Sequence, residues 1–182
     1  RRDLPDRLER PETVIDKGYV RSMARYNAWQ NRQLTDTLKE ARDADLRAER
    51  GGFFGSIMNT LNHLLWGDTI WMSRFVPSIA KPEGGIAESV DFTPTFAVWS
   101  ADRFRMDGAM LMWADTLSSL DLKGQLSWFS GALGRDVRKP LELCVVHMFN
   151  HQTHHRGQVH AMMTAAGLTA PVSDLFVMPE DL

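Results

Sequence analysis

The histidines are the residues of this sequence with the clearest capacity for chemistry. Five of the six lie between positions 147 and 160, and His147, His151 and His155 recur at every fourth position. Side chains four residues apart lie on one face of a helix, and such a histidine pair presents two imidazole nitrogens to a single metal ion. The sixth, His63, lies in a separate apolar segment. The spacing therefore predicts a metal site.

One helical metal motif, that of the zinc proteases, is excluded by a single residue. In that motif a glutamate follows the first histidine and acts as the general base, whereas Gln152 follows His151 here. A single histidine on a helix is more often a surface or hydrogen-bonded residue than a ligand. The repeated spacing favours the metal in this case, and it assigns no catalytic residue beyond the ligands.

Composition excludes several other classes of protein. The chain has 182 residues, a formal net charge of -2 and no basic block, so nucleic-acid binding has no electrostatic basis. Cys144 is the single cysteine, which excludes an intrachain disulfide. No apolar run approaches the ~20 residues of a membrane span, and the first residues are too polar for a secretory signal. We expect a cytoplasmic protein without membrane contact, folded as one domain over residues 1–182.

Four long segments with helical periodicity must position the histidines. They cover residues 17–41, 54–75, 94–117 and 141–166. Ser56 is a candidate cap for a late start of the second helix, and Thr93 followed by Pro94 predicts the start of the third. Gly67 lies one turn after His63 and leaves room beside that imidazole. Helices of this number and length predict an all-α, four-helix bundle with its core at about residues 17–166.

The connections between these helices differ in character. Residues 1–16 predict an irregular lead-in, residues 43–50 a charged connection and residues 76–94 a long loop. Residues 122–139 alternate apolar and polar side chains around two glycines, which predicts a short β-hairpin or extended excursion before the last helix. Bundles build metal sites from inward side chains on facing helices. His63 from the second helix should therefore meet His151 and His155 from the fourth.

Three segments resemble the DinB-like family of damage-inducible, metal-dependent proteins. They are residues 26–31, 61–68 and 150–158, and the likeness extends over most of residues 17–166. The resemblance implies a four-helix bundle with up-up-down-down connectivity, often dimeric, and a histidine triad that binds zinc or nickel. On this sequence the triad maps to His63, His151 and His155, with His147 as a reserve ligand.

Three neutral imidazoles would leave one coordination position of the metal open, as in catalytic zinc sites. Hydrolysis at that position needs a general base, whereas activation of a small thiol needs none, because the metal itself deprotonates the thiol. No glutamate adjoins the ligands, which favours thiol chemistry, although Asp68 or a loop carboxylate could supply a base. The resemblance likewise implies relatives that include thiol S-transferases and thiol-dependent isomerases.

Two further polar residues have alternative roles. Arg156 could bind a substrate carboxylate or lie on the solvent-facing side of its helix, which is the usual place for an arginine. Gln158 could orient a metal ligand or cap a loop. At helical spacing Trp29, Trp66 and Trp71 favour core packing over a pocket lining.

The sequence therefore supports two functions. The first is a metal-dependent thiol transferase or hydrolase that acts on a small molecule, with a low-molecular-weight thiol as cosubstrate and with the chain as a homodimer. The alternative is a non-catalytic stress-response or interaction module, in which the metal joins the second helix to the fourth. A fourth protein ligand would indicate the structural role, and an open position the catalytic one.

Overall fold

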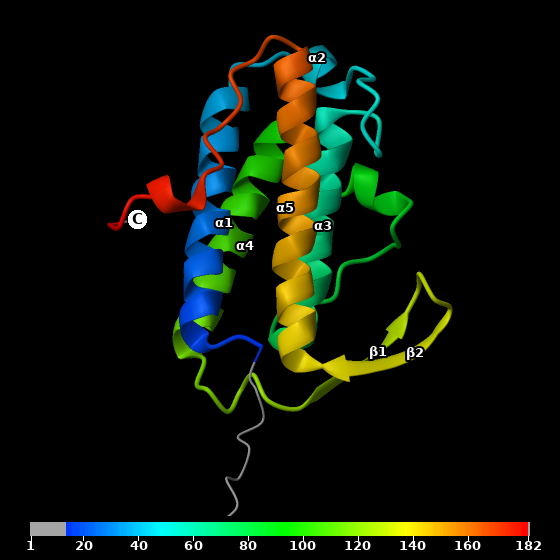
Figure 1. Ribbon diagram of the computed structural model, residues 1–182. Helices are drawn as coiled ribbons and strands as arrows, with labels where there is room; N and C mark the ends of the chain where they lie inside the picture. Colours follow the sequence, from blue (N-terminus) through cyan, green and yellow to red (C-terminus); the bar gives the residue numbers. More distant parts are fainter. Residues whose placement is uncertain (1–13, 182) are drawn as a thin grey trace, which may run out of the picture.

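The computed structural model describes residues 14–181, so most of the predicted lead-in lies outside the described residues. The described chain is mostly helical and carries one small antiparallel sheet, as the periodicity predicted (Figure 1). The helices are α1 (Lys17–Leu38), α2 (Asp43–Arg47), α3 (Ile57–Phe75), α4 (Phe96–Thr116) and α5 (Leu141–Ala165), with two short 3₁₀ helices, η1 (Glu88–Asp91) and η2 (Leu175–Val177). The strands are β1 (Gln125–Ser130) and β2 (Arg135–Pro140).

Polar side chains cap the long helices where the chain leaves an extended conformation. The Ser56 hydroxyl accepts the Asn59 N–H at 3.1 Å, so α3 begins late, as predicted. The cap of α4 is Thr95 and not Thr93, because Thr93 is buried and its hydroxyl donates to Asn62 Oδ1 at 2.6 Å. The prediction for Thr93 was therefore wrong by two residues.

The two shorter connections also contain regular structure. Residues 43–50, the predicted charged connection, include the short helix α2, in which Arg47 pairs with Asp43 at 2.9 Å across one helical turn. The hairpin expected within residues 122–139 is present, and Gln125 pairs with Pro140 at its open end. The Trp128 ring of β1 packs edge-on against Trp71 of α3, with centroids 5.5 Å apart, which holds the hairpin beside the helices.

The four long helices lie side by side, with α1 and α3 each in contact with both α4 and α5 (Figure 1). Contacts between the helices show that α1 and α5 run in one direction and that α3 and α4 run in the other. In chain order the directions are up, down, down, up, so the expected up-up-down-down connectivity was wrong. The reason lies in the connections. Residues 76–95, between α3 and α4, are long enough to pass back along α3, about 28 Å in length, so α4 begins near the start of α3 and runs parallel to it.

The interior is divided into three layers. One apolar cluster contains Leu38, Leu61 and Val159, and a second contains Val20, Met110 and Phe149. Between them the buried positions are polar. They are Asn27, Asn31, His63, Asp68, Arg103, Asp107, Gln152, His155 and Arg156. All the candidate functional side chains except His147 and Gln158 therefore lie in or beside this middle layer.

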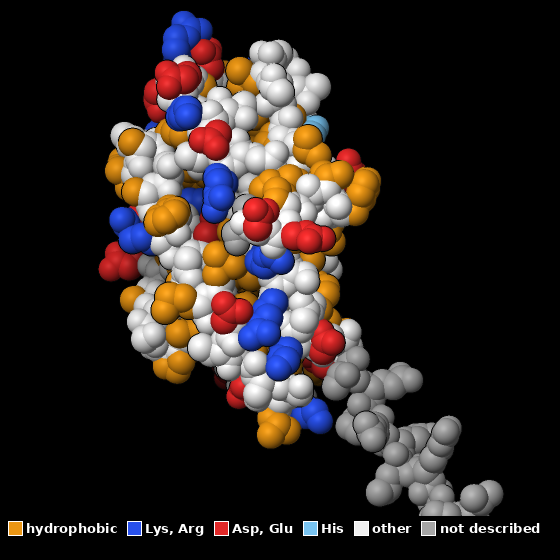
Figure 2. Space-filling view, turned by 90° about the vertical axis from the view of Figure 1, so that its left-hand side faces the viewer, with side chains coloured by type: hydrophobic (Ala, Val, Ile, Leu, Met, Phe, Trp, Pro, Cys, Tyr) orange, Lys and Arg blue, Asp and Glu red, His pale blue; other side chains and the backbone are white. Residues whose placement is uncertain are grey.

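The surface carries no large field of one sign on the face shown in Figure 2, where basic and acidic side chains are interspersed. Within residues 14–181, none of the helices combines the length and the hydropathy needed to span a membrane.

Candidate metal centre and buried polar layer

Three histidines from two helices converge between α3 and α5. The group consists of His63, His151 and His155. Each of them contributes one ring nitrogen, and these three nitrogens lie within 4.8 Å of one another. His63 Nε2 is 3.0 Å from His151 Nε2, and the ring centroids of His151 and His155 are 4.5 Å apart. His63 and His155 are buried and His151 is half-buried. The structure thus brings together the three side chains that the spacing predicted.

Gly67 allows α3 to approach α5 at this point. A Cβ atom built on Gly67 would lie 2.8 Å from His151 Cε1, closer than such atoms approach in proteins. The space beside His63, which the sequence analysis noted, is therefore occupied by the His151 ring. A glycine in a helix interior costs about 1 kcal/mol relative to alanine, and here it makes room for an imidazole.

A hydrogen-bond chain from η1 determines the tautomer of His63. The Ser89 hydroxyl donates its one hydrogen to the Ile86 carbonyl at 2.6 Å. Its oxygen must then accept from His63 Nδ1, 2.8 Å away. Because Nδ1 carries the proton, the Nε2 atom of neutral His63 presents a lone pair toward His151. The loop that contains η1 therefore orients a candidate ligand.

Gln158 has the corresponding role for His155. Its Nε2 donates to His154 Nε2 at 3.3 Å, which leaves Oε1 as the acceptor for His155 Nδ1 at 2.8 Å. His155 Nε2 is then the atom with a free lone pair. Gln158 lies inside α5, so it does not cap a loop. Imidazole ligands of metals are commonly oriented by such a bond at the other ring nitrogen.

Burial keeps these histidines neutral. Desolvation, followed by the charge of His155, lowers the pKa of His63 from 6.5 to about 4. Desolvation and the neighbouring histidines lower the pKa of His151 to about 3. The pKa of His155 is lowered as well, again mainly through desolvation. At neutral pH all three rings therefore offer lone pairs without first losing a proton.

The residues present fit a divalent metal ion. Within residues 14–181, the buried His151 Nδ1 has no hydrogen-bond partner, so the hydrogen bonds of the protein account for only one nitrogen of this ring. Zinc binds imidazole nitrogen at about 2.0–2.1 Å, which separates ligand nitrogens in a tetrahedral site by about 3.3–3.4 Å. The widest separation of 4.8 Å would close by small side-chain rotations. Within residues 14–181, no cysteine or carboxylate belongs to the group.

The reserve ligand lies outside this group. His147 is exposed and its ring packs against Trp71, with centroids 5.0 Å apart and with His151 6.2 Å away. Cys144 is a buried free cysteine that is likewise absent from the group. Aromatic rings cover the site instead. Phe54 lies 4.0 Å from the His63 ring between centroids, and buried Trp66 stacks on His63 at 5.9 Å.

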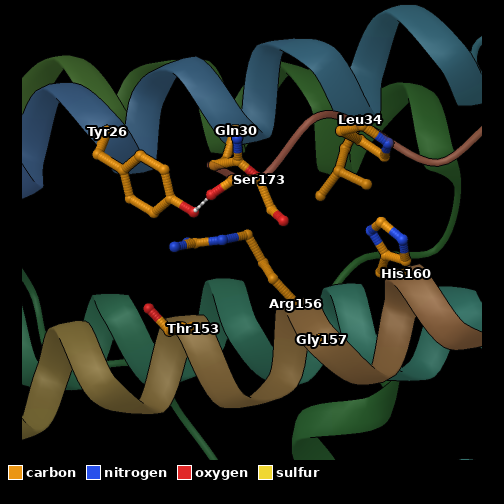
Figure 3. A pocket seen from close by; sticks show the side chains of 9 residues that line it. Tyr26, Gln30, Leu34, Thr153, Arg156, Gly157, His160 and Ser173 are labelled. Atoms are coloured by element: carbon orange, nitrogen blue, oxygen red, sulfur yellow. Dashed lines mark hydrogen bonds between the residues drawn. The ribbon is translucent and has the colours of Figure 1, made fainter. Parts of the chain in front are cut away.

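Arg156 does not lie on the solvent-facing side of α5, so that reading was wrong. Its side chain is buried between α5 and α1, where one Nη donates to Asn27 Oδ1 (Figure 3). The guanidinium carbon also lies 5.4 Å from the centre of the Tyr26 ring. Desolvation lowers the pKa of Arg156 to about 10, so the group stays cationic at neutral pH. It points to α1, whereas its neighbour His155 points to α3.

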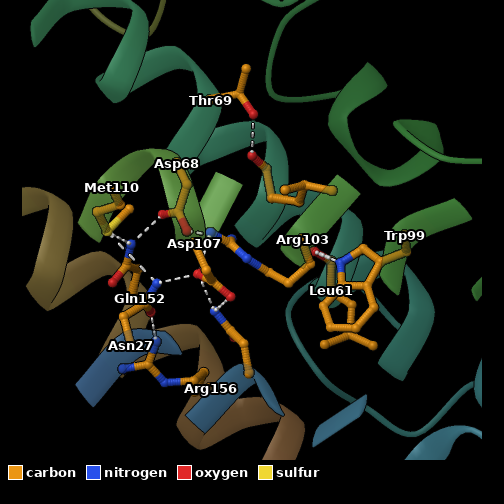
Figure 4. A network of polar contacts seen from close by, with 12 residues as sticks. Asn27, Leu61, Asp68, Thr69, Trp99, Arg103, Asp107, Met110, Gln152 and Arg156 are labelled. Atoms are coloured by element: carbon orange, nitrogen blue, oxygen red, sulfur yellow. Dashed lines mark hydrogen bonds and ion pairs between the residues drawn. The ribbon is translucent and has the colours of Figure 1, made fainter. Parts of the chain in front are cut away.

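Asp68 belongs to a buried polar layer that the sequence analysis did not identify (Figure 4). Its oxygens accept hydrogen bonds from Arg103 on α4 and, at 2.6 Å, from Gln152 on α5. Arg103 also pairs with Asp107 at 2.7 Å. Because both Asp68 oxygens are engaged inside the protein, this carboxylate does not face water and is not free to act as a base.

Two asparagines of α1 complete the layer. Asn27 donates to Asp107 Oδ1 at 3.1 Å, and Asn31 donates to both oxygens of Asp107 at 3.0 and 3.2 Å. One signal in the sequence could have indicated them. Asn27 and Asn31 are four residues apart, as are Arg103 and Asp107, so each pair lies on one helix face among apolar neighbours.

The comparisons with known proteins agree on one family. The model of the DinB family matches residues 15–180. The chain is 24% identical over 152 residues to Protein DinB of Bacillus subtilis (strain 168), which covers 82% of this chain and 87% of that protein. It is also similar to the crystal structure of a DinB-like protein from Bacillus cereus ATCC 10987. That similarity has a TM-score of 0.61 at 20% identity and covers 81% of this chain and 90% of the other.

Proposed function

The chain belongs to the DinB family, and from that premise we propose that it is a metal-dependent enzyme that activates a small thiol or water. The observation that carries the proposal is the convergence of three neutral imidazoles from α3 and α5. The Nδ1 atoms of His63 and His155 are hydrogen-bonded to Ser89 and Gln158, respectively. The lone pairs on their Nε2 atoms are therefore free to bind a metal. A cluster that binds no metal would not require these lone pairs to converge in a buried place.

His63, His151 and His155 would hold the ion, which we propose to be zinc or nickel. Bound there, the ion would lower the pKa of a thiol or water so that it becomes a nucleophile at neutral pH. The residues around it orient the ligands and exclude solvent. Phe54 and Trp66 pack on His63, while His151 is the half-buried member of the group and thus marks the side open to solvent.

Thiol activation is the better supported of the two reactions. Metal-assisted hydrolysis usually employs a general base within hydrogen-bond reach of the water. Asp68 is committed to Arg103 and Gln152, and within the described residues no other carboxylate joins the histidine group. A thiol needs no such base. We therefore propose a thiol transferase that uses a low-molecular-weight thiol and an electrophilic small molecule.

The competing function is a non-catalytic module in which the ion joins α3 to α5. The origin of the ligands on two directly packed helices favours it. Against it stands the donor count, because structural zinc sites use four protein ligands and the group contains three. The two functions predict different reactivity for the same metal content.

The first test is the metal content of the purified protein. Wild-type protein should retain close to one divalent ion per chain, and His151→Ala should lower metal affinity by about 100-fold or more, since a ligand is removed. His147→Ala is the matched control, from the same helix face one turn away, and it should retain the metal. Stoichiometric metal in His151→Ala, or equal loss in His147→Ala, would contradict the assignment.

The second test separates catalysis from structure. A panel of low-molecular-weight thiols and electrophiles is screened with native protein, with chelator-treated protein and after metal is restored. Conjugation that disappears with the metal and returns with it supports the enzyme. Full metal occupancy with no conjugation or hydrolysis across the panel would favour the structural module.

Family membership supports further features that we include in the proposal. These are a four-helix bundle as the fold type, a homodimer in solution, a cytoplasmic location and a role in the stress response. Light scattering of the purified chain tests the dimer directly.

A further inference from the structure

A cavity of about 320 Å³ lies on the other face of α5 from the histidines. It opens between α1 and α5 and is covered by the segment after α5 (Figure 3). Its lining includes Tyr26, Gln30, Leu34, Arg156, His160 and Pro171. The volume is at the lower end of the range for small-molecule sites, which begins at about 300 Å³. The proposed metal chemistry does not use this space.

The C-terminal segment that covers the cavity is bound to α1. Tyr26 donates its hydroxyl to the Ser173 carbonyl at 2.6 Å, and Gln30 donates to the Val172 carbonyl at 2.6 Å. Arg25 donates to the Pro179 carbonyl at 3.1 Å. Gln33 also donates to the Val172 carbonyl, at 3.2 Å, so four side chains of α1 bind the backbone of this segment. These carbonyls are therefore engaged by α1, and Arg156 makes no hydrogen bond to them.

Arg156 is a buried cation whose hydrogen-bond capacity is largely unused. One Nη donates to the neutral amide of Asn27, and within residues 14–181 no carboxylate oxygen lies within 4.0 Å of the guanidinium. Asp107 shares Asn27 with Arg156 as a hydrogen-bond partner, and both Asp107 and Asp68 are paired directly with Arg103. Figure 3 shows the guanidinium in the space between α1 and α5. Buried charges are normally paired, because leaving one unpaired is costly.

The other residues that line the cavity restrict which ligand could pair with Arg156. Among the described residues no Asp or Glu lines the cavity, and Leu34 and Pro171 supply apolar surface. Asp107 lies directly behind Asn27, to which it is hydrogen-bonded, so a second negative charge on a ligand would be repelled. A planar carboxylate matches the paired N–H groups of a guanidinium.

We propose that this cavity binds a small organic monocarboxylate, with its carboxylate on Arg156 and its apolar part against Leu34 and Pro171. The site is independent of the metal, since Arg156 faces α1 and the histidines face α3. It gives the protein a second ligand-binding position, adjacent in sequence to the metal ligand His155.

The test is a titration of acetate, butyrate and benzoate, each against its primary amide, followed by amide chemical shifts of Thr153 and Gly157. Butyrate or benzoate should bind while the amide does not. Arg156→Gln should weaken binding by about tenfold or more, as expected for loss of a charge-assisted hydrogen bond. Arg32→Gln, at an exposed position of α1, is the matched control and should leave affinity unchanged.

A second variant keeps the test valid if Arg156→Gln fails to fold. Gly157 lines the cavity, and a Cβ atom added there meets nothing within 4 Å. Gly157→Leu should therefore fold normally, occupy the space and abolish carboxylate binding. His151→Ala should bind the carboxylate as wild type does, which shows that the metal centre is not the site.

Several outcomes would overturn the proposal. They are equal binding of acid and amide, unchanged affinity in Gly157→Leu, equal weakening by Arg32→Gln, or no shift with any monocarboxylate at millimolar concentration. Inorganic phosphate that binds more tightly than benzoate would overturn the restriction to a single charge.

Discussion

The histidine cluster and the polar layer around Arg103 lie side by side on α3 and α5, yet they differ in how their polar groups are paired. In the layer all four oxygens of Asp68 and Asp107 accept hydrogen bonds from side chains. In the cluster two imidazole nitrogens face each other at 3.0 Å, and the other ring nitrogen of His151 has no partner. The layer pairs its carboxylates inside the protein, although Arg103 Nε and Gln152 Oε1 have no hydrogen-bond partner within residues 14–181, whereas the cluster gathers neutral imidazoles without any charged partner.

The two regions also differ in what they connect. The layer joins α1, α3, α4 and α5, because Asn31, Asp68, Arg103 and Gln152 come one from each helix. The cluster joins only α3 and α5. Damage to the layer should therefore reduce the stability of the whole fold, while damage to the cluster should chiefly remove a ligand.

The largest expected effect comes from removing the central cation of the layer. Arg103→Met keeps the length of the side chain but leaves Asp68 and Asp107 buried without their shared counter-ion. Loss of one partner of a buried ion pair costs about 3–5 kcal/mol. We expect a decrease of this size in the free energy of unfolding, measured by urea denaturation of metal-free protein.

The control for this prediction is Arg105→Met, on the exposed face of the same helix, where Arg105 pairs only with Asp102. Surface changes of this kind usually stay within about 0.5 kcal/mol. Similar stabilities of the Arg103 and Arg105 variants would mean that the layer does not hold the helices together, and the contrast with the cluster would fail.

The second prediction concerns acid and the cluster. The pKa values of His63 and His151 are about 4 and 3 in the native state against 6.5 as the ordinary value. Below pH 6.5 the unfolded chain binds protons at these positions and the native chain does not. The free energy of unfolding of metal-free protein should therefore fall as the pH drops from 6.5 toward 4. Between pH 7.5 and 5.5 we expect a loss of about 2 kcal/mol, allowing for the solvent contact of His151.

Replacement of both rings isolates this effect. The double variant His63→Gln, His151→Gln carries no titrating group at these positions, so its stability should depend less on pH over the same interval. Thermal unfolding of both proteins across that range provides the measurement. An unchanged pH dependence would mean that the two imidazoles have the same pKa in the native and unfolded states, contrary to their burial.

The sequence was sufficient to predict most of the histidine cluster, because that prediction depends on the spacing of residues within one helix. Spacing of four residues places His151 and His155 on one face of α5 whatever that helix packs against. The helix boundaries, the Ser56 cap and the hairpin likewise depend on neighbouring residues. The pairing with His63 needed one further assumption, that the second and fourth helices are in contact.

The polar layer and Arg156 were beyond the sequence because they depend on contacts between helices. Arg103 and Asp68 are 35 positions apart, and their pairing requires α3 and α4 to pack against each other. The predicted connectivity was different, and for Arg156 the usual exposure of arginine favoured the solvent-facing side over the binding of a substrate carboxylate. The average exposure of arginine predicts the wrong position for a side chain that finds a hydrogen-bond partner in a buried polar layer. Arg156 finds such a partner in Asn27.

The smallest expected effect tests how closely the cluster depends on the approach of α3 to α5. Gly67→Ala places a methyl group 2.8 Å from His151 Cε1, and the His151 ring can turn aside because it is the end of a side chain. We expect the variant to fold, with stability within about 1 kcal/mol of wild type, because alanine also favours the helix. Its metal affinity should fall about tenfold, as measured by competition with a chromophoric chelator.

Gly108→Ala is the matched control, since a Cβ atom there meets nothing within 4 Å and lies on α4, away from the histidines. Equal metal affinity in both variants would show that the position of His151 does not depend on Gly67. A large loss of stability in Gly67→Ala would show that the contact supports the fold, and the distinction between the two regions would then be weaker than we infer.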